Sequence, residues 1–470
     1  MDQAAWARRT FLKRAGQGLA SLPLLSGVSL VGQTSAKHNA PVVARRPAVH
    51  LNVRDFGATG DGKTKDTAAI QQALDRCSVL GGGEVLVPAG DYLTGPIALK
   101  SNTLLRLEEG ATLNGSPDMA DYPLTQVQWE GKWIKGYLCM VSAMDAENIS
   151  IVGKGKIVGS PTVKGRVDRK TQLRLPALIE FTSCKNVLVQ DYFTKDFGMW
   201  SIHPTYCENI TFRNVVVRSG ADGIDLDSCK HVVIDGCDFD TTDDCISLKS
   251  GRGAEGYAIL RPTEDVRISN CTFLDAVWAC IGIGSETSGG IRNVHVEHCK
   301  CLGARTFAIY IKSRPGRGAF IEDIYINDLE INDLEVSGAK AGFLRFNILD
   351  SGKQDEVPVP GDEGIPTIKN FHFSNIKVTD VPWLVDGLNI HPNKPLEGFS
   401  LTNVTGTCGK GISLANIEHA ELKNINVIGF TGPLLSTCNV TGTGLAGAVP
   451  LEAKKNPEAI PVPATPYSLR

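Results

Sequence analysis

The sequence predicts an all-β fold in which short parallel strands stack as the coils of a solenoid. Two similar strings, Asp222-Gly-Ile-Asp-Leu-Asp and Asp244-Cys-Ile-Ser-Leu-Lys, begin 22 residues apart. The strings CIGIGS at 280–285 and AIYIKS at 308–313 repeat the same pattern further along the chain. A repeat in this range, with short β-rich units and variable insertions, indicates a solenoid in which each unit forms one coil.

Alternation within each unit assigns the side chains to two faces, because residues two apart in a strand share a face. One inward column consists of Ile202, Ile224, Ile246, Ile281 and Ile309. One outward column, which we expect to face water, consists of His203, Asp225, Ser247, Gly282 and Tyr310. Neighbouring strands lie about 4.8 Å apart, so equivalent residues of successive coils become neighbours in space.

Residues 50–440 are predicted to form the β-helix, with residues 50–115 as its N-terminal capping part. Residues 67–77 carry Ala, Ile and Leu at helical spacing, and we expect this to be the only long helix. A terminal unit of this kind covers the open edge of the first coil. From Asn148 onward, polar turns alternate with strings of β-branched and aromatic residues, which is typical of strands.

Several stretches interrupt the repeat. The segment 117–137 is predicted to be irregular, and its two tryptophans either stack on sugars or pack against the side of the barrel. Loops are expected near 252–263 and 338–366, and both should rise off the coils. The proline-bearing residues 441–470 are predicted to form a non-repetitive tail.

The N-terminus indicates export. Arg8-Arg9 precede an apolar stretch from Ala15 to Val31 that glycines and a proline interrupt. A charged start, an apolar middle and a small-residue end predict a twin-arginine-type signal peptide over residues 1–36, followed by a linker over residues 37–49. The alternative is a membrane anchor, which the interruptions disfavour. We therefore expect a periplasmic or secreted protein that has no membrane attachment after signal removal.

Composition restricts partners and cofactors. The formal net charge of −3 argues against nucleic acid as the main partner. The 13 cysteines form an odd number, so complete pairing is impossible. Cys245 and Cys280 lie in register, and we expect them to be buried and unpaired. The chain has no CxxC pair, which disfavours a zinc site. We expect no metal site and no cofactor.

Three carboxylates, Asp222, Asp243 and Asp244, precede neighbouring strands of the predicted stack. Two carboxyl groups that flank a glycosidic bond are enough for hydrolysis, because one protonates the leaving oxygen and the other activates water. Crowding of three carboxylates should raise the pKa of one of them and supply a proton donor. The alternative interpretation is that Asp222 and Asp244 only cap turns.

The chain resembles glycoside hydrolase family 28, the polygalacturonases and rhamnogalacturonan hydrolases of right-handed parallel β-helix fold. The resemblance covers about residues 50–440. Its motifs stand in the family's order and are RDFGATGDGKTKDTAAIQQAL, IHP, ADGIDLDSC, TDDCISLKSG, IGIGSE and YIKSRPGRG. Together they are highly specific, although each alone would be weak. The resemblance implies a monomeric, cofactor-free glycosidase whose partner is a pectic polysaccharide or oligosaccharide.

Residue roles follow by position from the resemblance. Asp243 matches the family's general acid, and Asp222 and Asp244 match the pair that holds and deprotonates water. Lys312 matches the lysine of the family's Arg-Ile-Lys motif and implies substrate binding. Lys249 is a further candidate for substrate binding.

Other candidates for contacts with substrate come from the repeat itself. Asp225 shares a column with His203, whereas Lys249 and Lys312 share the next one, and an outward Asp–Lys column could instead be an ion-pair ladder. His203 and Trp200 lie 22 residues before Asp225 and Asp222. We expect His203 to form a hydrogen bond with substrate, and Trp200 either stacks on a sugar or packs laterally.

Departures from the family pattern bear on the choice of substrate. No histidine lies near Trp278-Ala-Cys280, and Tyr310 stands where the motif has its arginine. A tyrosine cannot replace the bidentate, charged carboxylate contact of an arginine. The sequence therefore favours an inverting hydrolase of galacturonic-acid-containing pectin that prefers rhamnogalacturonan to homogalacturonan.

Three other functions remain open from the sequence alone. The first is a polygalacturonase proper. The second is a pectate-lyase-like β-elimination, in which acidic residues bind calcium and Arg218 or Arg252 is the base. The third is a non-catalytic β-helix that binds carbohydrate.

Overall fold

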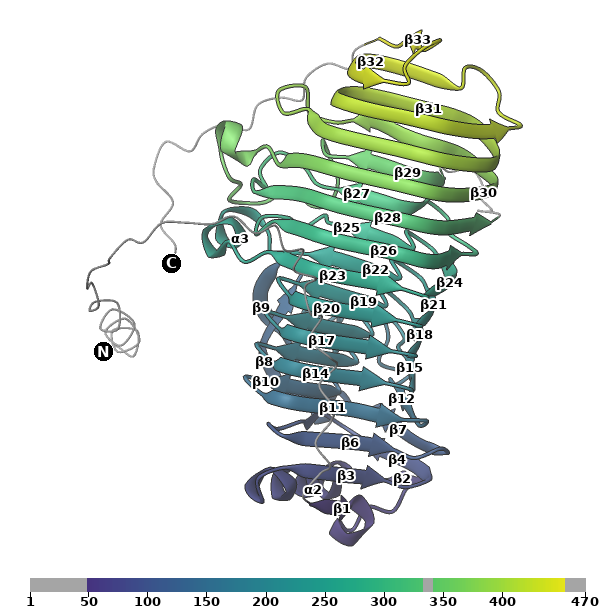
Figure 1. The fold of residues 1–470 in the computed structure, drawn as a ribbon. Coiled ribbons are helices and arrows are strands. Elements are labelled where there is room, and N and C mark those ends of the chain that lie inside the picture. The colour runs from purple at the N-terminus through teal and green to yellow at the C-terminus, as the bar shows by residue number, and fades with distance from the viewer. Residues whose placement is uncertain (1–48, 333–340, 453–470) are drawn as a thin grey trace, which may run out of the picture. The chain divides into compact units, whose positions relative to one another are not determined.

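The computed structural model describes residues 49–332 and 341–452, which belong to one compact unit, Arg46–Arg470. The chain winds as a single-stranded right-handed parallel β-helix, and Figure 1 shows its coils stacked in chain order. The predicted signal peptide and linker lie outside the described residues. No helix in the described part of the chain is long and apolar enough to cross a membrane.

Three ladders of parallel strands build the coils. The first ladder contains β1 (His50–Asn52), β3 (Gly83–Val87), β6 (Thr103–Leu107), β11 (Glu147–Gly153), β14 (Lys185–Gln190), β17 (Glu208–Arg213), β20 (Lys230–Asp235), β23 (Thr263–Ser269), β26 (Ile291–Cys301), β28 (Phe320–Asn332), β30 (Thr367–Asn389) and β31 (Leu396–Ile428). The second contains β2 (Asp61–Lys65), β4 (Gly90–Thr94), β7 (Ala111–Gly115), β12 (Lys156–Val158), β15 (Phe193–Lys195), β18 (Val216–Ser219), β21 (Asp238–Thr241) and β24 (Thr272–Ala276).

The third ladder carries the acidic cluster, and we call it the site ladder. It contains β5 (Ile97–Ala98), β10 (Val141–Met144), β13 (Ile179–Thr182), β16 (Ile202–Thr205), β19 (Ile224–Asp227), β22 (Ile246–Lys249), β25 (Ile281–Ile283), β27 (Phe307–Lys312) and β29 (Gly342–Asn347). Its register confirms the predicted isoleucine column, because Ile224 pairs with both Ile202 and Ile246, and Ile281 pairs with Ile309. All of these side chains are fully buried, so the column lies in the core.

The turns between strands repeat one backbone conformation. Asn102, Asn148, Asn186 and Asn209 all have positive φ angles between 56° and 62°. Asparagine tolerates this left-handed conformation better than most residues. The side-chain amides of Asn148, Asn186 and Asn209 also donate to the amide oxygen of the asparagine in the previous coil, at 2.8 to 3.1 Å. This ladder of amides holds successive coils in register.

The N-terminal end has the helix that the sequence predicts. Helix α2 (Thr67–Val79) buries Ile70, Ala73, Leu74 and Cys77. It contacts β1, β3, β5 and β6, together with the short 3-10 helix η1 (Val53–Phe56). Its apolar face therefore packs on the first coils of the β-helix.

Two expectations about the interruptions require correction. Segment 117–137 is not irregular, because after η2 (Met119–Asp121) it forms the antiparallel hairpin of β8 (Leu124–Trp129) and β9 (Lys132–Tyr137). The loop expected at 338–366 includes β29, a strand of the site ladder, so the insertion begins only after that strand and holds η3 (Gly361–Gly364). Its first residues, up to residue 340, lie outside the described ranges. The insertion expected near 252–263 is present between β22 and β23, and it contains a short helix, α3 (Gly253–Ile259).

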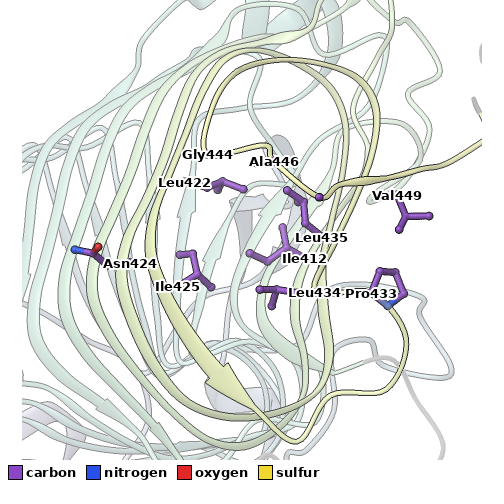
Figure 2. A pocket seen from close by; sticks show the side chains of 11 residues that line it. Ile412, Leu422, Asn424, Ile425, Pro433, Leu434, Leu435, Gly444, Ala446 and Val449 are labelled. Carbon is purple, nitrogen blue, oxygen red and sulfur yellow. The ribbon is translucent and has the colours of Figure 1, made fainter.

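The stack also extends past residue 440, where the sequence predicts that the tail begins. Strand β32 (Leu435–Thr443) pairs with β31, and β33 (Val449–Pro450) pairs with β32. A hollow of about 450 Å³ lies among these last coils (Figure 2). Its lining contains Leu422, Ile425 and Leu435 and no acidic or basic side chain. The hollow thus lacks the groups that acid–base chemistry requires.

Candidate active site

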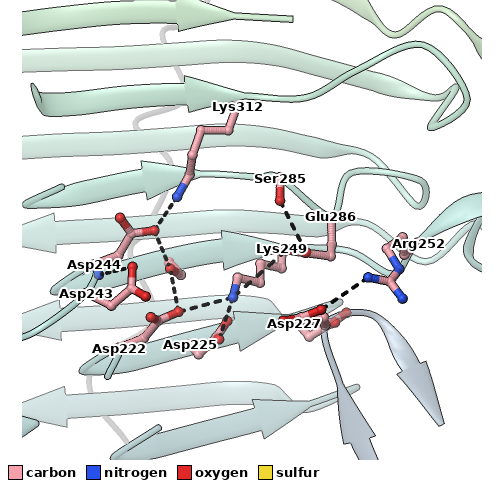
Figure 3. Close-up of polar contacts among 12 residues, drawn as sticks. Asp222, Asp225, Asp227, Asp243, Asp244, Lys249, Arg252, Ser285, Glu286 and Lys312 are labelled. Carbon is pink, nitrogen blue, oxygen red and sulfur yellow. Dashed lines mark hydrogen bonds and ion pairs between the residues drawn. The ribbon is translucent and has the colours of Figure 1, made fainter. Parts of the chain in front are cut away.

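Backbone pairing of the site ladder brings the three predicted carboxylates together. Gly223 N donates to Asp244 O at 3.0 Å, so the turn before β19 lies against the turn before β22. Asp222 stands in the first of these turns, and Asp243 and Asp244 stand in the second. Figure 3 shows the three side chains gathered on one side of the ladder. The repeat spacing of the sequence is therefore what makes them neighbours.

A single hydroxyl links two of the carboxylates. Ser247 Oγ lies 3.1 Å from Asp222 Oδ2 and 2.9 Å from Asp244 Oδ2. One hydroxyl hydrogen can serve only one of these oxygens at a time. Asp222 and Asp244 thus face a common position, the Ser247 hydroxyl, from two coils.

Two buried lysines neutralise the carboxylates of this cluster. Lys312 Nζ on β27 donates to Asp244 Oδ2. Lys249 Nζ on β22 lies 2.7 Å from Asp225 Oδ2 and 3.1 Å from Asp222 Oδ2. Buried charges require such partners, because an unpaired charge away from water is costly.

Glu286 adds a further buried acid to this network. Its Oε2 lies 3.9 Å from Lys249 Nζ. Burial alone would raise the pKa of Glu286, but the charges of Lys249 and Arg317 outweigh that effect and lower the pKa. The carboxylate therefore adds to the negative charge around Lys249.

Asp243 differs from the other two carboxylates in its surroundings. Its side chain is 27% exposed, whereas those of Asp222 and Asp244 are buried. Burial and the charges of Asp222 and Asp244 raise the pKa of Asp243 to about 6, against the opposing charge of Arg166. Asp243 is thus the carboxyl group of the cluster that combines access to solvent with a pKa of about 6.

The pKa values of Asp222 and Asp244 shift in opposite directions. Burial would raise the pKa of Asp222, but the charges of Lys249, Lys312 and Arg166 outweigh it and lower the pKa. Burial raises the pKa of Asp244, which the charge of Lys312 only partly offsets. Groups with diverging pKa values in one cluster can divide acid and base work between them.

Two predicted substrate contacts are not at the surface. The sequence places His203 in a column that faces water, but its side chain is only 2% exposed. Its Nδ1 lies 3.2 Å from Glu180 Oε1, and its Nε2 lies 3.3 Å from Thr205 Oγ1. Trp200 is also 2% exposed and packs beside His203, with the ring centroids 4.5 Å apart. The alternative of lateral packing is therefore the one that the structure has for Trp200.

The rest of the outward column is also buried, contrary to the expectation that it faces water. Asp225 and Ser247 have no exposed surface, and Tyr310 is nearly buried. The physical reason is that other segments lie over the column. Gln128 of the β8–β9 hairpin donates to Asp227. Segment 159–178, between β12 and β13, reaches Asp243 through Arg166.

Lys249 thus pairs with Asp225 of the neighbouring outward column and not with Asp227, its register partner in the same column. Tyr310 packs against Ala279 and Phe307 and stacks on Trp278 at 6.5 Å between ring centroids. Trp278 is 44% exposed. Arg345, which pairs with Tyr310 in register, lies over the same tyrosine ring at 5.3 Å.

Sequence reasoning missed the residues that the covering segments contribute. Arg166 binds Asp243 from segment 159–178, which has no repeat pattern. Arg174 of the same segment is fully buried and pairs with Glu180. Repeat arithmetic places residues of the coils only, so it offers no signal for side chains that arrive from an insertion. For Glu286 a signal existed, because it ends the motif IGIGSE.

The comparisons with known proteins agree with this fold and cluster. The model of glycosyl hydrolases family 28 matches residues 77–341, and the chain belongs to this family. It is therefore a glycosidase built on a parallel β-helix.

Individual relatives are 27–29% identical to this chain over the aligned residues. A protein named probable polygalacturonase from Vitis vinifera is 28% identical over 367 residues, which cover 75% of this chain and 73% of the relative. An exo-poly-alpha-D-galacturonosidase from Dickeya chrysanthemi is 27% identical over 57% of this chain and 52% of its own length. The crystal structure of a hyperthermoactive exopolygalacturonase from Thermotoga maritima superposes with a TM-score of 0.72 at 29% identity, covering 82% of this chain and 94% of that one.

Proposed function

We propose that the protein is an inverting hydrolase that cleaves a galacturonic-acid-containing glycosidic bond in pectic polysaccharide or oligosaccharide. The observation that carries the proposal is the contrast between Asp243 and the pair of Asp222 and Asp244. Asp243 has a pKa of about 6 and an accessible side chain. The other two face one position across Ser247.

In this mechanism Asp243 donates its proton to the leaving glycosidic oxygen as the bond to the anomeric carbon breaks. A water molecule held by Asp222 and Asp244 attacks that carbon from the opposite face. Asp222, whose pKa is lowered, accepts the proton that the water loses. The product is a hemiacetal of inverted configuration, and the leaving sugar carries a free hydroxyl.

Two observations support galacturonate as the sugar, namely the names of the relatives and the presence of an exposed positive charge in the cluster. The named activities of the relatives from Vitis vinifera and Dickeya chrysanthemi concern polygalacturonate. Arg166 is a cation of the cluster with an exposed side chain, which suits an anionic sugar.

For the sugar beyond the scissile bond we propose a neutral residue, as in rhamnogalacturonan. Tyr310 supplies no charge there. Arg345 lies behind the tyrosine ring, and its charge already has Asp386 as a partner at 3.5 Å. A uronate in this position would therefore have no free guanidinium to bind.

We also propose that attack occurs at a chain end. On the β16 side of the cluster, Glu180, His203 and Trp200 lie under the covering segments, with Trp200 in an apolar cluster that includes Ala177. A polymer that bound by its middle would need this side of the ladder. On the opposite side, the exposed ring of Trp278 offers a stacking surface for the rest of the chain. The relative from Dickeya chrysanthemi has an exo-type name, which supports this assignment.

The test is a product profile on defined homogalacturonan and rhamnogalacturonan oligomers. Two readouts monitor the reaction, the release of reducing ends and the ultraviolet absorbance of the products. Hydrolysis at a chain end releases one short product from the first turnovers. A ladder of intermediate lengths would contradict end attack. An absorbing unsaturated product that a chelator abolishes would indicate β-elimination instead, and no release from any oligomer would indicate a binding protein.

We further propose that the enzyme acts as a monomer in the periplasm or outside the cell after twin-arginine-type export. Arg8-Arg9 and the apolar stretch that follows them support the export route. Replacement of both arginines by lysine should leave the precursor in the cytoplasm. A mature enzyme that still appears outside would contradict this route.

A further inference from the structure

Arg166 is the side chain that connects segment 159–178 with the acidic cluster. The backbone around it is fixed, because Leu175 N donates to Arg166 O at 3.0 Å and Val167 forms a bridge with Arg174. The segment also packs closely on the turn before β16. A Cβ atom added to Gly198 would lie 1.9 Å from Gly165 N. Arg166 therefore starts from the β16 side and extends along the ladder to Asp243.

The contact between Arg166 and Asp243 opposes the role proposed for Asp243. A guanidinium group stabilises the carboxylate form, whereas a general acid must carry a proton. The charged groups that face Asp243 are Asp222, Asp244, Lys312 and Arg166. Lys312 is bonded to Asp244, so Arg166 is the cation that binds the Asp243 carboxylate directly.

Arg166 is also the accessible cation of the cluster. Its side chain is 43% exposed, whereas those of Lys249 and Lys312 are each 9% exposed and bonded to aspartates. An arginine presents two parallel N–H groups that match the two oxygens of a carboxylate. A sugar that enters beside Asp243 meets this group first.

We propose that Arg166 determines specificity by binding the carboxylate of the galacturonate on the β16 side of the scissile bond, and that it leaves Asp243 when it does so. The proposal rests on the proposed function. The carboxylate of the uronate replaces that of Asp243 as the partner of Arg166. Asp243 then takes up a proton, which Asp243 later donates to the leaving oxygen. A neutral or esterified sugar in the same place offers no such exchange.

The exchange affects the chemical step and not only binding. With a uronate bound, Asp243 loses the cation that stabilises its ionised form. An ester leaves Arg166 on Asp243 and therefore leaves more of the enzyme without a proton donor. The preference for a free carboxylate is expected in kcat as well as in KM. It does not conflict with a neutral leaving sugar, because Tyr310 lies on the opposite, β27 side of Asp243.

The experiment compares the wild-type enzyme with R166Q, R166K and R169Q on two substrates. Arg169 is an exposed arginine of the same segment and provides the matched control. The substrates are an oligogalacturonate with free carboxylates and the same oligomer fully methyl-esterified. We expect R166Q to lower kcat/KM on the free acid by about 10- to 100-fold, from the loss of a charged hydrogen-bond pair. Its activity on the ester should not fall, because without Arg166 more of the enzyme keeps the proton on Asp243, and R166K should recover part of the preference for the free acid.

A pH profile separates specificity from a merely structural role. Loss of the Arg166 cation raises the pKa of Asp243 in the free enzyme. The alkaline limb of kcat/KM should thus move to higher pH in R166Q and stay in place in R169Q. An unchanged ratio of acid to ester activity, or an unmoved limb, would overturn the assignment of Arg166.

Titration calorimetry with trigalacturonate distinguishes failure of the Arg166 assignment from failure of the proposed function. Absence of hydrolysis by the wild-type enzyme overturns the function. Equal affinity of the wild-type and R166Q proteins for trigalacturonate overturns the carboxylate contact. Weaker binding by R166Q, with R169Q unchanged, supports the contact whether or not turnover is seen.

Discussion

Gly282 lies directly beside the Asp244 carboxylate, so closely that a Cβ atom added to it would lie 2.3 Å from Asp244 Oδ2. The same Cβ would lie 2.9 Å from Lys312 Nζ. The outward column of the site ladder therefore needs a residue without a side chain at this coil. The acid and the lysine that neutralises it share the space that a methyl group would fill.

The first prediction concerns this glycine. G282A should separate Asp244 from Lys312 and lower kcat/KM at least about tenfold, with a loss of about 1–3 kcal/mol of stability from overpacking. Gly159 is the matched control, because a Cβ there would meet its nearest neighbour, Leu178, at an ordinary 3.6 Å. Kinetics and thermal unfolding of both variants check the prediction. Equal activity of G282A and G159A would show that the site accommodates the methyl group.

The second prediction concerns the proton donor. D243N keeps the shape of the side chain but removes the transferable proton, so kcat should fall about 10²- to 10⁴-fold. The variant should remain folded, since Asp243 lies partly exposed at the edge of the cluster. Turnover and circular dichroism are the measurements. A variant that keeps nearly wild-type turnover would refute the role of Asp243.

The third prediction is the pH dependence. Asp243 must be protonated and its pKa is about 6, so kcat/KM should fall as pH rises above about 6. The pKa of Asp222 is lowered, so its ionised form persists to acid pH and the acid limb lies well below that value. D243E has a different proton donor at this position, so its alkaline limb should move. An identical limb in D243E and the wild-type enzyme would contradict the assignment of this limb to Asp243.

The same pKa predicts how stability changes with pH. The pKa of Asp243 in the folded protein exceeds the value of about 3.9 that an unfolded chain has. The folded state thus binds more protons between about pH 4 and 6, and this contribution to stability is lost as pH rises through that window. D243N lacks the contribution, so the stability difference between the wild-type protein and D243N should fall over the same window in urea titrations.

The fourth prediction concerns the sugar beyond the scissile bond. In direct competition, homogalacturonan should be cleaved at least about tenfold more slowly than an oligomer with rhamnose in that position, since a charged hydrogen bond is absent. Y310R should narrow this gap only in part, because the new guanidinium would lie beside Arg345 and Lys312. Preference of the wild-type enzyme for unsubstituted polygalacturonate would refute the inference from Tyr310.

The sequence predicts the coils well but predicts poorly the segments that cover the site ladder, and the reason is physical. Spacing between repeats fixes which residues stack, so the isoleucine column and the meeting of Asp222 with Asp244 follow from counting. Burial of His203 does not follow, because it depends on where an insertion folds back. Hairpin β8–β9 and segment 159–178 carry no repeat, and their position depends on contacts such as Gln128 with Asp227 that pair residues far apart in the chain.

The fifth prediction concerns the thiols. The structure has no disulfide in residues 49–332 and 341–452, and Cys245 and Cys280 are fully buried, as the sequence predicts. We expect mass spectrometry of the mature protein to find both as free thiols. A disulfide that involves either residue would contradict their place in the core.

The cysteines of successive coils also give the protein a built-in probe of local opening. Cys184, Cys207 and Cys229 stand at equivalent positions of three coils, and the backbone N of Cys184 lies 3.3 Å from Cys207 Sγ. A thiol reagent reaches such a sulfur only while the coil around it is open, so its rate of labelling measures that opening. Cys438, near the C-terminal end, is less buried than the others and should be labelled first. The order of labelling along the chain would then show from which end the stack frays, without the introduction of any new cysteine.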